Sequence, residues 1–130
     1  MPRNPWHNRL SKPLLLRRGN GFFLTRVRHA TSSIERMKGL IGVKPSHHTY
    51  GLVFHLNNPS ILSASIHMLF MQMPIDVVWL DSKQKVVDWK GNIRPWTLHH
   101  SPFSPAAFII ELPSHTLTRI PLTVGKKIEW

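Results

Sequence analysis

The sequence predicts a mainly β domain, α+β by count, built as a small antiparallel β-barrel or jelly-roll-like domain with one short helix near residues 32–42. Several short runs rich in aromatic and β-branched residues alternate with turn-forming segments. Eleven prolines and seven glycines in 130 residues are typical of many short elements, and a single segment carries helix signals. We expect residues 1–20 to form a basic, flexible leader and residues 21–130 to form a single domain.

The predicted strands begin with the aromatic run FFLTRVRH at residues 22–29. Further strand-like runs follow, separated by segments rich in Gly, Pro, Asn and Ser, at residues 50–56, 61–70, 75–81, 86–90, 107–112 and 127–130. Many short strands at such spacing favour an antiparallel sheet that is closed or folded into two layers, with the helix covering one side.

The segment SSIERMKGLIG, near the start of the predicted domain, carries the helix signal. Ser32 at the N-cap and Glu35 three residues later match the capping-box pattern. Ile34, Met37 and Ile41 recur at helical spacing and therefore share one face. We expect a single short helix here.

Basic residues dominate the charge of the chain, whose formal net charge is +11. Residues 1–38 carry nine Lys and Arg against Glu35 alone, whereas residues 39–130 carry eight basic and five acidic side chains. A cationic N-terminus supplies sequence-independent affinity for nucleic acid or for an anionic surface. The leader cations that would do so are Arg3, Arg9, Lys12, Arg17 and Arg18.

The composition also excludes several classes. The chain has no cysteine, so disulfides, thiol catalysis and thiolate metal sites are ruled out. The N-terminus lacks the apolar segment of a secretory signal, and the uncharged stretch at residues 52–75 contains Asn, Pro, Ser and His. We therefore expect a cytoplasmic protein without a transmembrane segment, and we expect no cofactor and no metal.

The stretch SIHMLFMQMPIDVVWLD, residues 65–81, places two polar side chains, His67 and Asp76, in an apolar run. In an unbroken strand these two residues have opposite parity and point to opposite faces. Pro74 lies between them and cannot donate to a strand ladder, so we expect a bend or bulge there. Such an interruption would bring His67 and Asp76 to one face.

His67 and Asp76, with Glu111 as a third member, form the first candidate site. A histidine and carboxylates in apolar surroundings are suited to general acid–base catalysis or to holding a divalent metal. The alternative is structural, with His67 hydrogen-bonded in the core and Asp76 bonded to backbone amides at a strand end. The sequence has no HExxH, Gly-x-Ser-x-Gly or phosphate-loop pattern, and this favours the structural interpretation.

The second candidate is the segment KQKVVDWKGNIRPWTLHH, residues 83–100, in which four cations alternate with Trp89 and Trp96. Aromatic faces among cations are suited to stacking on bases or sugars and to holding phosphates. Trp89 shares strand parity with Val87 and is expected to pack inward. Arg94 and Trp96 flank a proline in a predicted loop, where binding residues are more common, and the alternative for Trp96 is a packing role.

Seven blocks in order along the chain, ERMKGLIG, YGLVF, SIHMLFMQMPIDVVWLD, KVV, RPW, FIIELP and VGK, resemble the family catalogued as domain of unknown function 192. The resemblance covers residues 22–130. It implies a compact, mostly β domain of barrel or jelly-roll type with one helix, in a family whose biochemical activity is not established. The family-like positions are Gly39, Leu40, Gly51, Ser65, His67, Met71, Pro74, Asp76, Asp81, Pro95, Trp96, Glu111, Leu112, Pro113 and Gly125.

The chain departs from the family pattern at four positions. Gln84 stands where a turn glycine is usual, and Thr97 stands where an arginine is common. His115 replaces a glycine, and Lys126 replaces an aspartate. The resemblance therefore implies a different distribution of charge at residues 97 and 126.

Taken together, these patterns predict one ligand-binding cleft, lined by His67, Met71, Asp76, Arg94, Trp96 and Glu111. Because no catalytic arrangement is recognisable, we favour a binding or accessory module for a small or anionic ligand. Two alternatives stay open. One is a hydrolase-like or metal-assisted enzyme that uses His67 and Asp76, and the other is nucleic-acid association through the basic leader.

Overall fold

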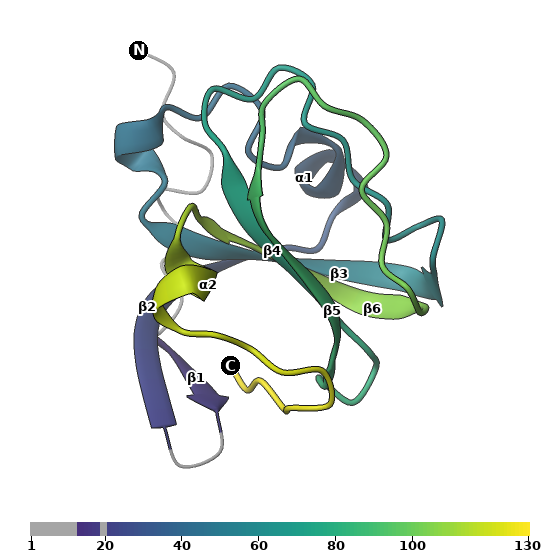
Figure 1. Cartoon of the computed structure of the whole chain (residues 1–130). Helices are drawn as coiled ribbons and strands as arrows, with labels where there is room; N and C mark the ends of the chain where they lie inside the picture. Colours follow the sequence, from purple (N-terminus) through teal and green to yellow (C-terminus); the bar gives the residue numbers. More distant parts are fainter. Residues whose placement is uncertain (1–12, 19–20) are drawn as a thin grey trace.

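The computed structural model describes residues 13–18 and 21–130, which form one six-stranded sheet with short helices (Figure 1). The strands are β1 (Pro13–Arg18), β2 (Gly21–Ala30), β3 (Tyr50–Ser60), β4 (Ile75–Leu80), β5 (Val86–Ile93) and β6 (Ala106–Pro113). The helices are α1 (Ser33–Lys38), the 3₁₀ helix η1 (Pro45–His47) and α2 (Thr116–Arg119). The predicted mainly β, α+β class is confirmed.

The strands follow the spatial order β1-β2-β3-β6-β4-β5. β2 and β3 are parallel and are connected through α1, whereas the other neighbouring pairs are antiparallel. β1 and β5 lie at the two edges, so the sheet in the described part of the chain is open. The closed barrel is therefore not formed, because strand spacing predicts how many strands there are but not whether the edge strands meet.

Both faces of the sheet are buried at its centre, and β4 shows how. Ile75, Val77 and Trp79 pack into an apolar cluster on one face, which we call the helix face because α1 lies over it (Figure 1). Val78 and Leu80 pack into a second cluster on the other face, which we call the C-terminal face because α2 and the segment after it cover it. The alternation follows from the two-residue period of a strand.

Helix α1 begins at the predicted cap, but it is shorter than the predicted range 32–42. The Glu35 amide donates to Ser32 Oγ at 3.1 Å, and the Ser32 amide donates to Glu35 Oε1 at 3.2 Å, which completes the capping box. The helix ends at Gly39, whose φ is +47°. A Cβ at Gly39 would lie 3.2 Å from the ring of Phe54, so glycine lets the end of α1 approach β3 closely.

The part of α1 that contacts the sheet is not the face on which the sequence places Ile34 and Met37. Ile34 and Met37 are 73% and 74% exposed, whereas Leu40, just after the helix, is only 1% exposed. A helix of six residues has little more than one full turn, so it meets the sheet through its C-terminal end rather than along a stripe. The pattern of Ile34 and Met37 therefore predicted the helix but not the side that it buries.

Residues 61–74 form turns instead of the strand predicted for 61–70. In this segment only Ile66 makes a strand-like bridge, to His100. Trp79 Nε1 donates to the carbonyl of Ala64 at 2.8 Å and holds the segment against β4. Ala64 and Met68 of this segment are buried in the cluster on the helix face, whereas Ile61, Leu62 and Phe70 are exposed.

The two ends of the chain also differ from expectation. The strand predicted for residues 127–130 is reduced to one bridge between Lys85 and Lys127, and α2 was not predicted. Residues 13–18, part of the expected leader, form β1 against β2. Residues 1–12 lie outside the described residues, so the division into leader and domain stays a prediction.

Candidate functional site

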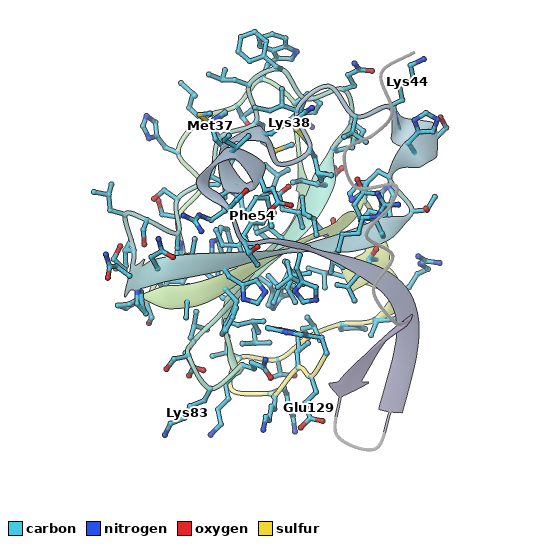
Figure 2. All side chains as sticks on the ribbon, turned by 180° about the vertical axis from the view of Figure 1, so that it is seen from behind. Met37, Lys38, Lys44, Phe54, Lys83 and Glu129 are labelled. Carbon is cyan, nitrogen blue, oxygen red and sulfur yellow. The ribbon has the colours of Figure 1, made fainter. Side chains whose placement is uncertain are left out.

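A cavity of about 300 Å³ lies on the helix face, between α1, the loop after β3, and the strands β3 and β6. In Figure 2, Met37 and Lys38 of α1 are seen above Phe54 of β3, which forms part of the wall. The apolar lining consists of Met37, Leu40, Ile41, Phe54, Leu56, Ile66, Met68, Met71 and Ile109. The polar lining includes Arg36, Lys38, Ser63, Ser65, His67 and Glu111. The volume is at the lower end of that of small-molecule pockets.

Glu111 is the only acidic residue in the described lining of this cavity. It stands on the central strand β6, opposite Leu52 of β3 and Val77 of β4, and is 8% exposed. Its carboxyl has no hydrogen-bond or ion-pair partner among the described residues. Burial raises the pKa of Glu111 to about 8, so the carboxyl holds its proton at neutral pH.

The mouth of the cavity carries basic side chains. Arg36 Nη1 donates to the carbonyls of Thr31 at 2.7 Å and His55 at 3.2 Å, so its guanidinium ties α1 to β3. Lys38 is exposed and has no hydrogen-bond or ion-pair partner in the part of the chain that the structure describes. His67 is exposed as well. The cavity therefore combines a cationic mouth with a buried acid that is neutral at pH 7.

His67 and Asp76 do not share this cavity. Pro74 stands immediately before β4, so the predicted interruption is present, but the convergence expected from it is wrong. Asp76 lies on the C-terminal face and is 1% exposed. Its two carboxylate oxygens accept the backbone N–H of Asn92 in β5 and of Leu117 in α2, each at 2.8 Å. Asp76 thus fixes two elements to β4, which matches the structural alternative.

Arg94 and Trp96 lie outside the lining as well. They follow β5 in a loop, and the Trp96 side chain is 62% exposed. The backbone N–H of Trp96 donates to the Met68 carbonyl at 2.8 Å, and the Trp96 ring packs against the Phe70 ring in an edge-on arrangement with centroids 5.1 Å apart. The single cleft predicted for six residues is therefore not formed. The cavity brings together three of them, His67, Met71 and Glu111.

The family model described as "Uncharacterized ACR, COG1430", the domain of unknown function 192, matches residues 16–130. The chain belongs to this family. The resemblance of the seven sequence blocks is thereby confirmed, and the match begins within β1.

Similar archaeal proteins carry the name UPF0127 protein. The chain is 40% identical over 105 residues to the one from Thermococcus sibiricus, a match that covers 81% of this chain and 66% of that protein. It is 38% identical over 104 residues to the one from Pyrococcus furiosus, covering 80% and 85% of the two chains. The chain therefore spans slightly less than two thirds of the length of the Thermococcus relatives that it matches.

Two solved structures share the fold. One is a protein of unknown function from Novosphingobium aromaticivorans, with a TM-score of 0.80, 23% identity, and coverage of 91% of this chain and 84% of that one. The other comes from Sinorhizobium meliloti, with a TM-score of 0.80, 19% identity, and coverage of 89% and 90%. At these identities the likeness concerns the fold alone.

Several family-like positions of the sequence meet in the cavity lining, namely Gly39, Leu40, Ser65, His67, Met71 and Glu111. Sequence reasoning missed Arg36, Lys38 and Ser63 as lining residues. The signal for the first two was their place in the family block ERMKGLIG, but their charges were assigned to the basic N-terminal excess.

Most of the basic leader lies outside the described residues. Arg3, Arg9 and Lys12 lie outside the described residues, and Arg17 and Arg18 belong to β1, so binding through them stays a prediction. Within residues 13–18 and 21–130, no three His, Asp or Glu side chains lie close enough to hold a metal ion. No helix in the described ranges has the length and apolar character needed to cross a membrane.

Proposed function

We propose that this protein is a binding module that holds a small ligand in the cavity between α1 and the sheet. The observation that carries the proposal is Glu111, a carboxyl buried on a central strand, facing the cavity, without a partner among the described residues. A buried polar group without a hydrogen bond lowers stability, and a polar group of a ligand would supply the missing bond.

The geometry favours binding over the enzyme that uses His67 and Asp76. Both oxygens of Asp76 are engaged by backbone amides on the C-terminal face, so this carboxylate neither orients His67 nor shares a substrate with it. A general acid–base pair needs both groups within reach of the same reacting atoms. A binding function needs only the cavity and its polar groups.

The test is a fragment screen followed by ¹⁵N NMR of the whole chain. Small neutral, anionic and cationic fragments are added, and the amides that shift are mapped onto the structure. We expect a subset of fragments to shift amides of the cavity lining. Ile41→Trp, in the lining, should abolish these shifts, whereas the matched Ile61→Trp, outside the lining, should retain them. Absence of any cavity shift, or shifts that survive Ile41→Trp, would contradict the proposal.

A second proposed function is association with nucleic acid through the leader, and it is motivated by the excess of positive charge in residues 1–38. Because residues 13–18 form β1, the deletion that tests it should stop at residue 12. We expect this deletion to weaken binding to a random DNA duplex and to reduce the dependence of binding on salt. Because Arg17 and Arg18 remain in this variant, unchanged affinity would eliminate binding through Arg3, Arg9 and Lys12 without affecting the cavity.

A further inference from the structure

Resting on the proposed binding function, we propose a chemical class for the ligand of the cavity. The ligand is a small amphipathic anion with a hydrogen-bond acceptor facing Glu111, an apolar middle, and a negative group at the mouth near Lys38. Each part of the ligand corresponds to one region of the cavity lining. These regions are a buried acid at the sheet, an apolar wall, and basic side chains toward solvent.

The inner end of the cavity favours a ligand group that accepts a hydrogen bond, because the protonated carboxyl of Glu111 donates one at neutral pH. Its pKa is raised to about 8 by burial, and no described group accepts its proton. A ketone, ester or amide oxygen placed there would receive that hydrogen bond. The neighbouring His48 contacts the backbone of Glu111, and burial lowers its pKa to about 4, so His48 adds no positive charge beside Glu111 between pH 7 and 9.

The mouth of the cavity favours a negatively charged group on the ligand. The titratable and charged groups of the lining are Arg36 and Lys38 from α1, His67 from the loop and Glu111 from β6, so the lining holds two basic side chains and one buried acid. Arg36 already donates to backbone carbonyls, whereas the ammonium of Lys38 is exposed and without a partner among the described residues. A cationic ligand would meet repulsion at the entrance, and an anion would meet attraction.

For the opposite class of ligand, an amine that pairs with ionised Glu111, the affinity should depend on pH in the opposite direction. An amine would need the carboxylate, so its affinity would rise as pH passes the pKa of Glu111. An acceptor needs the protonated carboxyl, so its affinity would fall over the same range. With a pKa of about 8, the protonated fraction decreases about tenfold between pH 7 and pH 9.

The experiment uses four probes of similar length with the full chain, and measures affinity by NMR titration of the amides that line the cavity. 6-Oxoheptanoate carries all three proposed parts. Heptanoate lacks the inner acceptor, and 6-oxoheptanamide lacks the negative charge. Heptylamine, which like heptanoate has no ketone, carries a positive charge in place of the negative one. At pH 7 we expect 6-oxoheptanoate to bind most tightly, with heptanoate roughly tenfold weaker because it leaves the proton of Glu111 without an acceptor. We expect the amide to be several-fold weaker and heptylamine to be the weakest.

Two matched pairs of variants locate these effects. 6-Oxoheptanoate should bind about tenfold more weakly at pH 9 than at pH 7 to wild type and to the exposed control Glu129→Gln, but equally at both pH values to Glu111→Gln. Lys38→Glu should remove the advantage of the acid over the amide. Lys44→Glu makes the same charge change outside the lining and should preserve that advantage (Figure 2).

The outcomes separate this inference from the function on which it rests. If heptylamine binds most tightly and gains affinity up to pH 9, the ligand class is wrong and the binding function stands. If none of the four probes occupies the cavity while other fragments do, the class is wrong in the same way. If neither the probes nor any fragment occupies the cavity, both proposals fall.

Discussion

Replacing Glu111 with glutamine should remove a pH dependence from the stability of the fold. Burial raises the pKa of Glu111 from 4.5 to about 8. Between these values the native protein keeps a proton that the unfolded chain has released, so the free energy of unfolding falls as the pH rises. This loss of stability is absent well below pH 4.5 and complete above pH 8. Glutamine does not titrate, so Glu111→Gln does not lose stability in this way.

The magnitude follows from the width of that pH window. The difference between about 8 and 4.5 is about 3.5 units, which at about 1.4 kcal/mol per unit corresponds to about 5 kcal/mol at full extent. From pH 5 to pH 9, the free energy of unfolding of wild type should fall by about 4 kcal/mol relative to that of Glu111→Gln. Other groups titrate alike in both proteins, so this difference isolates Glu111.

The assay is urea unfolding followed by tryptophan fluorescence, at half-unit steps from pH 5 to pH 9. Glu129→Gln is the matched control, because Glu129 is an acid whose side chain is 44% exposed and which pairs with Lys127 at 3.5 Å. Its profile should follow that of wild type across the range. A flat difference between wild type and Glu111→Gln would refute the inference that a buried proton resides on this carboxyl.

Three further substitutions test the surroundings of the site, each by urea unfolding. Asp76→Ala should lower the free energy of unfolding by about 3–5 kcal/mol, because two backbone amides lose their carboxylate acceptor. The control Asp88→Ala, in which the two lost amide contacts are exposed, should lower it by no more than about 1 kcal/mol. Equal losses would show that Asp76 does not hold the fold. Burial lowers the pKa of His48 from 6.5 to about 4, so wild type should lose about 3 kcal/mol relative to His48→Asn as the pH falls from 6.5 to 4, and parallel profiles would contradict this. Ser32→Ala removes half of the capping box, so it should cost about 1 kcal/mol and speed hydrogen exchange in α1, and unchanged exchange there would count against the cap.

The elements that the sequence predicted well are those whose signals are local. The capping box of Ser32 and Glu35 involves residues three positions apart, and the structure reproduces both of its hydrogen bonds. The strand β4 was predicted from a continuous apolar run with β-branched residues, which is typical of a strand buried on both faces. Neither prediction needed information about distant parts of the chain.

The errors arose where tertiary contacts decide. Residues 61–70 are as apolar as a strand, but they form turns in which Ala64 and Met68 are buried and Ile61, Leu62 and Phe70 are exposed, so an apolar run does not by itself specify strand pairing. The effect of Pro74 was predicted correctly as an interruption and wrongly as a means of convergence. Once the chain leaves the strand before Pro74, the parity of His67 no longer limits its position, and only the path of the loop decides where it lies.

The cavity was the part of the site that sequence reasoning had least means to find, because its walls come from α1, the loop, β3 and β6. Glu111 itself was noticed, but as a third partner of His67 and Asp76 rather than as the acid of a separate pocket. Its strand, β6, alternates regularly, with Ile110 and Leu112 on the C-terminal face and Ile109 and Glu111 on the helix face. An apolar residue at position 111 would fit that pattern without the desolvation that Glu111 incurs.

Stability and ligand binding therefore make opposite demands on residue 111. At pH 7 the displaced pKa of Glu111 costs the fold about 3 kcal/mol relative to a residue that does not titrate. No described partner offsets that cost, and the carboxyl faces a cavity instead of packed side chains. Proteins depart from local optimality mainly at functional sites, so the residue that weakens the centre of the sheet is the one that we expect to contact the ligand.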